Sequence, residues 1–229
     1  MVATSSDVTP LVDFVVTRKE TDPRQYAEVL FHPRVNLIEV DFVEGSVIQA
    51  RKNLVLHGTA PYVAWFDPDD ELYTWTMHTL IDEIVANPDL DAAFMLSDTL
   101  LPDGRQFQID INKFADEAMH SHLMRVIKRS FIEDNIELFN HPVAEWAMLA
   151  TLLTKNVVII PKSGFKWIPT AAGHHKTITS DAVIQTRLVV KGILGDKYDY
   201  SKKFKQPKRR PVWQLPHPKR SAQTTSSKS

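Results

Sequence analysis

The sequence predicts an α/β protein with a mostly parallel central sheet flanked by helices. Over residues 11–86, apolar segments that suit strands alternate with segments of helical periodicity. Within this pattern the run from Tyr62 to Phe66 is apolar throughout, which is typical of a strand buried on both faces. Alternating strands and helices favour parallel strands joined by right-handed crossovers. These observations predict one α/β domain over residues 11–197.

The individual elements follow from periodicity and from boundary signals. Helix starts such as Asp22-Pro23 and stops such as Asn87-Pro88 divide the apolar segments. Strands are expected at residues 11–17, 35–42, 62–66, 91–96 and 157–160, the last closed by Pro161. Helices are expected at residues 24–31, 46–56, 72–86 and 143–154. Residues 125–132 suggest a strand that passes into a short helix, and residues 98–121 are compatible with a hairpin or a mobile loop. The tryptophans Trp65, Trp75 and Trp146 are expected in the core.

Composition bounds the function classes. The 229 residues are 43% hydrophobic and 24% charged, which suits one globular domain with a substantial core. The chain has no cysteine, so disulfides, thiolate metal sites and cysteine nucleophiles are excluded. The first residues lack the pattern of a secretory signal, and no apolar run approaches the length of a membrane span. We therefore expect a soluble cytoplasmic protein.

Charge is distributed unevenly along the chain. From Lys202 to the end there are nine Lys or Arg residues and no acidic residue, whereas the remaining 18 basic and 28 acidic residues give a charge of −10. Residues 1–10 are expected to be a flexible lead-in, and residues 198–229 a basic and largely disordered tail. Such a tail suits nucleic-acid phosphates or an anionic membrane surface, and a solubilising tail without a partner is the alternative.

An acidic motif follows the buried strand. Asp67, Asp69 and Asp70 stand at its carboxyl end, the edge at which ligands of open α/β sheets bind. Three carboxylates there repel one another unless a cation compensates them, and oxygen ligands in this number suit Mg²⁺ or Mn²⁺. The alternative is an acidic turn that caps the following helix.

Further segments match one family in the right order. Upstream of the strand stands Ala50-Arg51-Lys52-Asn53, and downstream stand Glu145-Trp146 and Gly173-His174-His175-Lys176. With the acidic motif, these segments resemble glycosyltransferases of the GT-A fold, most closely the inverting family 2. The resemblance covers roughly residues 10–180. It implies a divalent cation on the diphosphate of a nucleotide sugar, and a carboxylate that accepts the proton of the acceptor hydroxyl.

The resemblance also implies roles for individual residues. The catalytic base would be Glu145, although the acid that precedes it in the family is missing. Nucleotide-sugar contacts are assigned to Thr17, Arg18, Asp41, Arg51 and Asp67. Metal ligands for Mn²⁺ or Mg²⁺ are assigned to Asp69, Asp70 and His175. Acceptor contacts are assigned to Trp146, Trp167, Lys203 and Arg209. For several of these residues a structural role is the alternative: helix stabilisation for Glu145, solvent exposure for the histidines and core packing for Trp167.

These features predict a metal-dependent, inverting glycosyltransferase, a hexosyl- or pentosyltransferase that uses a nucleoside-diphosphate sugar. Two acceptor classes stay open: hydroxymethylated pyrimidine in DNA, as for small phage enzymes, and a glycan or lipid-linked glycan. A non-catalytic GT-A-like module that binds a sugar nucleotide or a nucleic acid is the alternative, because the acid before Glu145 is missing.

Overall fold

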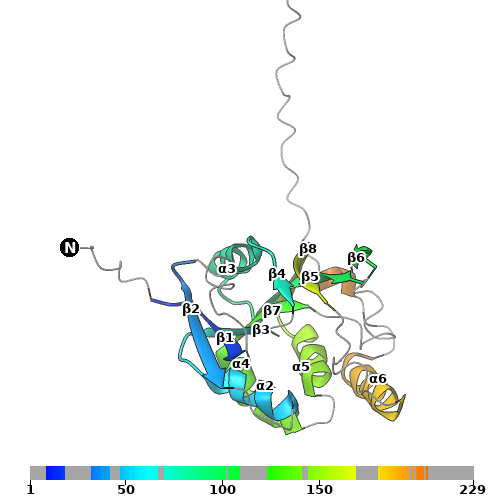
Figure 1. Ribbon diagram of the computed structural model, residues 1–229. Helices are drawn as coiled ribbons and strands as arrows, with labels where there is room; N and C mark the ends of the chain where they lie inside the picture. The colour runs from blue at the N-terminus through cyan, green and yellow to red at the C-terminus, as the bar shows by residue number, and fades with distance from the viewer. Residues whose placement is uncertain are drawn as a thin grey trace, which may run out of the picture.

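One mixed sheet with helices on both faces makes up the body of the protein (Figure 1). The computed structural model describes residues 9–18, 32–41, 47–66, 70–101, 103–108, 123–140, 144–168, 180–195, 198, 200–203 and 205. Within these residues the sheet has eight strands, seven of them in the order β2-β1-β3-β7-β5-β8-β4, with β6 paired to β5. The strands are β1 Val12–Arg18, β2 Val35–Asp41, β3 Tyr62–Phe66, β4 Glu71–Leu72, β5 Ala92–Leu100, β6 Gln106–Gln108, β7 Met124–Lys128 and β8 Val157–Trp167.

The strand directions confirm a mostly parallel sheet. Strand β1 is parallel to both β2 and β3, and β5 is parallel to β8. Strand β7 is antiparallel to β3 on one side and to β5 on the other, so β3 and β5 point the same way. The carboxyl ends of β1, β2, β3, β5 and β8 therefore meet at one edge of the sheet, called here the carboxyl edge.

Two hydrophobic clusters cover the two faces of the sheet. The helices are α2 Val47–Leu56, α3 Thr76–Ala86, α4 Arg129–Asp134, α5 Ala144–Leu153 and α6 Ser180–Leu194, with 3-10 helices η3 Ile136–Asn140 and η5 Tyr200–Lys203. Side chains of α2, α4, α5 and α6 belong to one cluster and those of α3 to the other, on the opposite side of the sheet (Figure 1). All five residues of β3 are buried, with Trp65 on the α5 face and Phe66 on the α3 face. The expectation of a strand buried on both faces is confirmed.

The expected helix at 72–86 begins four residues later than predicted. Leu72 belongs to β4, where it pairs with Phe165 of β8, and Tyr73 N donates to Gly164 O at 3.0 Å. Strand pairing thus takes these residues away from the helix, whose first residue is Thr76. Trp75 was expected in the core, but it is 38% exposed. Val85, an apolar residue of the same helix, is 53% exposed.

Strand β8 continues past the proline that was expected to close it. Pro161 lies where the register between β5 and β8 shifts, because Met95 pairs with Ile160 but Leu96 pairs with Ser163. A proline cannot donate a ladder hydrogen bond, and a bulge leaves such a residue unpaired without ending the strand. The strand therefore reaches Trp167 at the carboxyl edge.

The ambiguous segment after β5 begins as a hairpin. Leu101 N donates to Arg105 O at 2.9 Å, Gly104 has φ of +82°, and β6 then pairs antiparallel with β5. The expected elements at residues 11–17, 35–42, 46–56, 125–132 and 143–154 are confirmed to within one or two residues. The expected helix at 24–31 lies outside the described residues, and α6 was not predicted.

The start of the expected tail packs on the body. Tyr198 Oη donates to Leu153 O, and Lys205 N donates to Ile159 O at 2.8 Å. The ammonium of Lys205 forms an ion pair with Glu83, which is only 5% exposed in α3. Tyr198 and Lys205, which lie beyond the domain boundary expected at 197, therefore contact the body. Among the described residues, no helix combines the length and apolarity that crossing a membrane requires.

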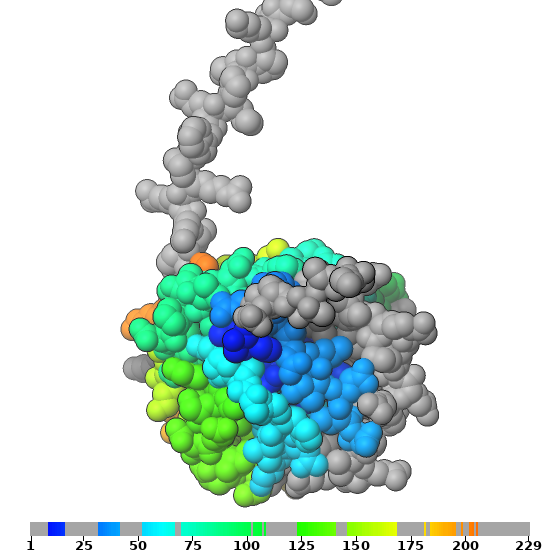
Figure 2. Space-filling model, turned by 90° about the vertical axis from the view of Figure 1, so that its left-hand side faces the viewer, coloured from blue at the N-terminus to red at the C-terminus, as the bar shows by residue number. Residues whose placement is uncertain are grey.

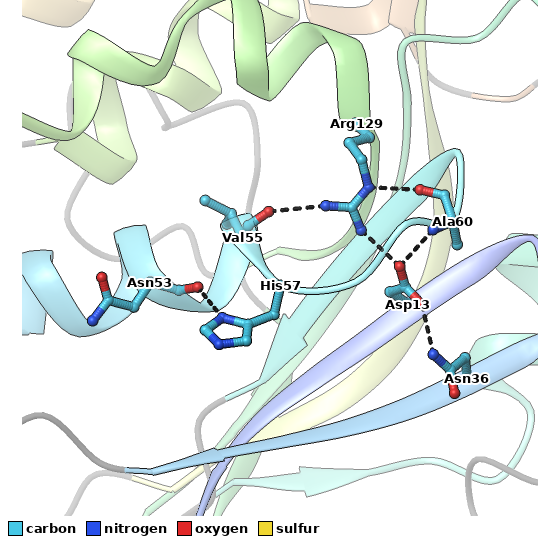
Figure 3. Close-up of polar contacts among 7 residues, drawn as sticks. All are labelled: Asp13, Asn36, Asn53, Val55, His57, Ala60 and Arg129. Carbon is cyan, nitrogen blue, oxygen red and sulfur yellow. Dashed lines mark hydrogen bonds and ion pairs between the residues drawn. The ribbon is translucent and has the colours of Figure 1, made fainter.

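A buried ion pair closes the edge opposite to the carboxyl edge (Figure 3). Asp13 in β1 is 1% exposed and accepts hydrogen bonds from Arg129 Nη2 at 2.7 Å, Ala60 N at 2.6 Å and Asn36 Nδ2 at 2.9 Å. Arg129 also donates to the carbonyls of Ala60 at 2.7 Å and Val55 at 3.2 Å. Both charges are thus paired and hydrogen-bonded, which is the condition for burying them. At the surface, α2 lies next to the segment that contains α4 and η3 (Figure 2).

Candidate functional site at the carboxyl edge

The structure brings the ends of three parallel strands together. Strand β1 ends in Thr17 and Arg18, and Arg18 is the cross-strand partner of Asp41, the last residue of β2. On the other side of β1, Val16 pairs with Phe66, the last residue of β3. Thr17, Arg18 and Asp41, predicted to contact the nucleotide sugar, therefore lie at the edge where the acidic motif begins. Asp41 is exposed. The side chains of Thr17 and Arg18, and all of Asp67 and Asp69, lie outside the description.

Helix α5 begins toward the same edge. Its end at Leu153 leads through residues 154–156 into the amino end of β8, so the helix runs opposite to β8 on the α5 face. Glu145 is the second residue of this helix, in its first turn. Trp146 is half-buried and packs against the core cluster. The helix backbone thus places Glu145 toward the carboxyl edge. The structure does not describe its side chain.

One hydrogen bond connects two segments that were predicted to bind metal. Asp70, the last acid of the motif, accepts at Oδ1 from Ile168 N at 2.9 Å. Ile168 directly follows β8 and begins the stretch that contains His174 and His175. Trp167, predicted to contact the acceptor, is half-buried against the cluster on the α3 face. The end of the acidic motif and the start of the histidine segment are therefore adjacent.

The described residues alone do not form a metal site. No group of three or more His, Asp or Glu residues that could hold an ion is present among them. Of the predicted ligands only Asp70 is described, while Asp69 and His175 lie outside. Asp70 has the hard oxygen donors that Mg²⁺ and Mn²⁺ prefer, and its carboxylate is held at the carboxyl edge. The donor set of the motif therefore suits such a cation.

A polar cluster that the sequence analysis missed follows the motif. Asp98 in β5 accepts from Tyr73 Oη, from Ser163 Oγ and from Gln106 Nε2, each at 2.6 Å. Burial, together with the hydrogen bond to Asp98, raises the pKa of Tyr73 to about 12. Burial opposes ionisation of Asp98, but the hydrogen bonds from Ser163, Tyr73 and Gln106 outweigh it and lower its pKa. The only sign of this cluster in the sequence is that the apolar run of β5 becomes polar at Ser97, where the strand reaches the carboxyl edge.

A second missed residue is Arg125 in β7. Its guanidinium lies 4.7 Å from the centroid of the Trp65 ring, a cation–π contact on the α5 face of the sheet. Trp65 stands two residues before Asp67, so a half-buried positive charge lies close to the start of the acidic motif. No local sequence pattern indicates that Arg125 lies beside Trp65, because the pairing of β7 with β3 determines this position.

The structure does not place three other predicted residues at the carboxyl edge. Lys203 donates from Nζ to Lys155 O at 2.6 Å, near the amino end of β8, and burial lowers its pKa. It therefore lies toward the opposite edge from the predicted acceptor site. Arg51 is within α2, but its side chain is not described. Arg209 lies outside the described residues.

Comparisons with known proteins find similarity in structure but not in sequence. No protein-family model matches the sequence, and no curated protein matches it. The fold is similar to that of S. aureus TarS, residues 1–349, in complex with UDP-GlcNAc, with a TM-score of 0.52 and 12% identity over 84% of this chain and 69% of that one. The chain has a GT-A fold. A second structure of TarS 1–349, in complex with UDP, gives a TM-score of 0.48 and 12% identity over 83% of this chain and 58% of that one.

The GT-A fold confirms the fold class that the sequence predicted. Within it, the acidic motif directly follows β3, and the helix with Glu145 begins toward the edge at which β3 ends. The segment with His174 and His175 follows β8, whose end is joined to Asp70.

Proposed function

We propose that this protein is a glycosyltransferase that moves a sugar from a nucleoside-diphosphate sugar to an acceptor hydroxyl. The hydrogen bond between Asp70 and Ile168 N carries the proposal, because it joins the two segments that would hold a metal and a diphosphate. The complex of TarS with UDP-GlcNAc, a protein of similar fold, supports a sugar nucleotide as the donor class. Nucleotide contacts would come from Thr17, Arg18, Asp41, Arg51 and Asp67.

The reaction needs a proton acceptor and a stabilised leaving group. Glu145 would take the proton of the acceptor hydroxyl, and attack from the face opposite to the diphosphate would invert the anomeric carbon. Asp69, Asp70 and His175 would hold Mn²⁺ or Mg²⁺, which neutralises charge on the leaving diphosphate when bound. Arg125, half-buried near the start of the motif, adds positive charge on the α5 face.

Calorimetry with UDP and other nucleoside diphosphates, with and without Mn²⁺, tests this proposal. We expect binding that requires Mn²⁺ and that is lost in Asp69→Ala. The matched control is Asp134→Ala, which removes an exposed carboxylate at the end of α4 and should bind like the wild type. If no nucleoside diphosphate binds in the presence of Mn²⁺, the protein is not a glycosyltransferase of this type.

A second experiment separates an enzyme from a non-catalytic module. Ala144 stands where the family has an acid, which favours the module, so turnover has to be measured directly. A panel of nucleotide sugars is screened for Mn²⁺-dependent hydrolysis or transfer. An enzyme that uses Glu145 as its base should lose turnover in Glu145→Gln while binding the nucleotide as before. Equal turnover in Glu145→Gln would contradict the assigned base, and nucleotide binding without any turnover would establish the module.

A further inference from the structure

Two stacked aromatic rings, those of Tyr73 and Trp75, form a surface beside the proposed site that is called here the aromatic step. Tyr73 and Trp75, in the connection between β4 and α3, are stacked with ring centroids 4.5 Å apart and planes inclined by 9°. Trp75 is 38% exposed, yet its Nε1 donates to Ser163 O at 3.0 Å. Tyr73 is held by the bond from its hydroxyl to Asp98. A large apolar ring that is exposed and also held in one orientation is typical of a binding surface.

Two side-chain amides border this aromatic step. Gln106 Nε2 donates to Tyr73 Oη at 3.0 Å as well as to Asp98, and Gln108 Nε2 donates to Ser163 Oγ at 2.9 Å. Both glutamines are exposed. These bonds use the amide nitrogens and leave the amide oxygens without a partner among the described residues. The surface therefore combines an apolar ring with oriented amide groups, the usual composition of a site with a few placed polar groups.

The charges around the step cancel. Lys166 pairs with Glu71 at 3.0 Å and Arg105 pairs with Asp103 at 2.8 Å. Among the described residues that contact the two rings, the other charges are the carboxylate of Asp98 and the ammonium of Lys162, which lies 4.3 Å from the centroid of the Trp75 ring. Binding to a DNA backbone depends on several cations that neutralise phosphates, and the described part of this surface has no such excess of positive charge. A neutral ligand fits it better.

Two basic residues at the start of the tail, Lys203 and Lys205, are engaged elsewhere. Lys203 donates to Lys155 O near the amino end of β8, and Lys205 pairs with Glu83 of α3. Within the described part of the tail, these two lysines are bound to the body rather than directed to the step. They do not supply the positive charge that a DNA acceptor would need there.

The step lies close to the reaction proposed above. Tyr73 follows Asp70 by three residues, and β4 between them pairs with β8 just before Ile168, the partner of Asp70. We propose that Tyr73, Trp75, Gln106 and Gln108 form an acceptor subsite for a neutral saccharide. A sugar ring would stack on Trp75 in place of the exposed ammonium of Lys162, and its hydroxyl groups would bind the glutamine amides. The assignment of this ligand as the acceptor rests on the proposed glycosyltransferase function.

Binding of soluble saccharides to the full chain tests the subsite without any turnover. The probes are maltohexaose, cellohexaose, chitohexaose and a short DNA duplex that contains 5-hydroxymethylcytosine, each titrated by calorimetry in the absence of nucleotide. We expect at least one of the three saccharides to bind. Its affinity should fall about tenfold or more in Trp75→Ala, as for loss of a central aromatic contact, and should also fall in the double variant Gln106→Ala/Gln108→Ala.

The controls separate the subsite from folding and from the nucleotide site. Leu56→Ala removes an exposed apolar side chain, 52% exposed, at the end of α2, and should leave saccharide binding unchanged. Both subsite variants should keep the Mn²⁺-dependent UDP affinity and the circular dichroism of the wild type. The double glutamine variant keeps the test valid should Trp75→Ala fail to fold.

Three results would overturn the inference. These are no binding of any of the three saccharides, binding that both subsite variants retain, and duplex binding that the subsite variants lose. Saccharide binding that depends on Trp75, in a protein that binds no nucleoside diphosphate, would keep the saccharide site but refute its role as an acceptor subsite. Failure of the subsite and failure of the proposed function are therefore distinguishable.

Discussion

Arg129 Nη2 lies 2.7 Å from Asp13 Oδ2, although the two residues are 116 positions apart in the chain. The contact joins β1 to the residue that directly follows β7, at the edge opposite to the proposed site. The five hydrogen bonds of this network leave neither charge uncompensated. The network thus holds one edge of the sheet together, and the proposed site lies at the opposite edge.

Loss of Arg129 should be strongly destabilising. Arg129→Ala leaves the carboxylate of Asp13, with its side chain 2% exposed, buried without its cation. Removing one partner of such a pair costs about 3–5 kcal/mol, which urea unfolding can measure. The matched control is Arg105→Ala, which breaks an ion pair whose side chains are 76% and 52% exposed and should cost less than about 1 kcal/mol. Equal losses in the two variants would refute the structural role of the network.

Substitutions at two glycines with the same φ distinguish the cost of backbone strain from the cost of steric crowding. Gly58 and Gly104 both have φ of +82°, a conformation that costs an alanine about 1–2 kcal/mol. A Cβ at Gly104 meets nothing within 4 Å, whereas one at Gly58 would overlap Asp13 Oδ2 and Ile38 Cδ1. We expect Gly58→Ala to lower the free energy of unfolding clearly more than Gly104→Ala. The idea fails if chemical denaturation gives the same loss for both.

The hydrogen bond between Tyr73 and Asp98 should contribute to stability. Tyr73→Phe removes the donor at 2.6 Å and keeps the ring, so we expect a loss of about 1–2 kcal/mol in urea unfolding. If the hydroxyl only faces solvent, the variant will be as stable as the wild type. The phenylalanine ring should still stack on Trp75, so saccharide binding should fall less than in Trp75→Ala.

Asp98 makes this contribution dependent on pH. Folding lowers the pKa of Asp98 below its ordinary value of 3.8, so the folded state favours the ionised carboxylate. Its contribution is complete above pH 3.8 and is lost as the pH falls through the lower folded-state pKa. The stability difference between the wild type and Asp98→Asn should therefore be constant from pH 7 to about 4 and shrink below that. A difference that grows on acidification would contradict the assignment.

Truncation should reveal where the body ends. A chain that stops after Lys205 keeps the ion pair with Glu83 and the bond to Ile159 O, so it should unfold like the full chain. A chain that stops at residue 197 loses both contacts and the bond from Tyr198 to Leu153 O. We expect it to melt several degrees lower in calorimetry, since about 1 kcal/mol shifts the melting temperature by about 2–4 °C at this size. Lys205→Met, which leaves Glu83 buried without its cation, should reproduce part of the loss.

The sequence was a good guide to the interior of the fold. An uninterrupted apolar run predicts β3, which is buried on both faces, and helical spacing of apolar residues predicts α5. Both patterns are visible in the sequence because burial determines the composition of these elements. The position of Asp70 at the carboxyl edge followed from the same reasoning. The order of β7 between β3 and β5 was not readable, since pairing of distant strands leaves no local pattern.

The errors lie where tertiary contacts override local signals. Residues 71–73 have helical neighbours, yet the ladder with β8 makes two of them a strand, and Trp75 is consequently exposed at a surface rather than buried. Asp13 reads as a polar residue within a strand, and only the arrival of Arg129 from far along the chain explains its burial. Lys203 was grouped with the basic tail by charge alone, although its contact with Lys155 O places it against the body.

The bulge in β8 has a consequence for which side chains reach the ligand. Between Ile160 and Phe165 the strand contains three residues, Pro161, Lys162 and Gly164, that have no partner position in β5. Because three is odd, the alternation of faces is reversed beyond the bulge, so Ile160 and Phe165 both pack on the α3 face. Deleting any one of the three residues would move every following side chain of the strand to the other face of the sheet. Phe165 would then point toward the polar cluster and Lys166 into the core. The number of residues in this irregular segment therefore determines which side chains of β8 face the proposed site.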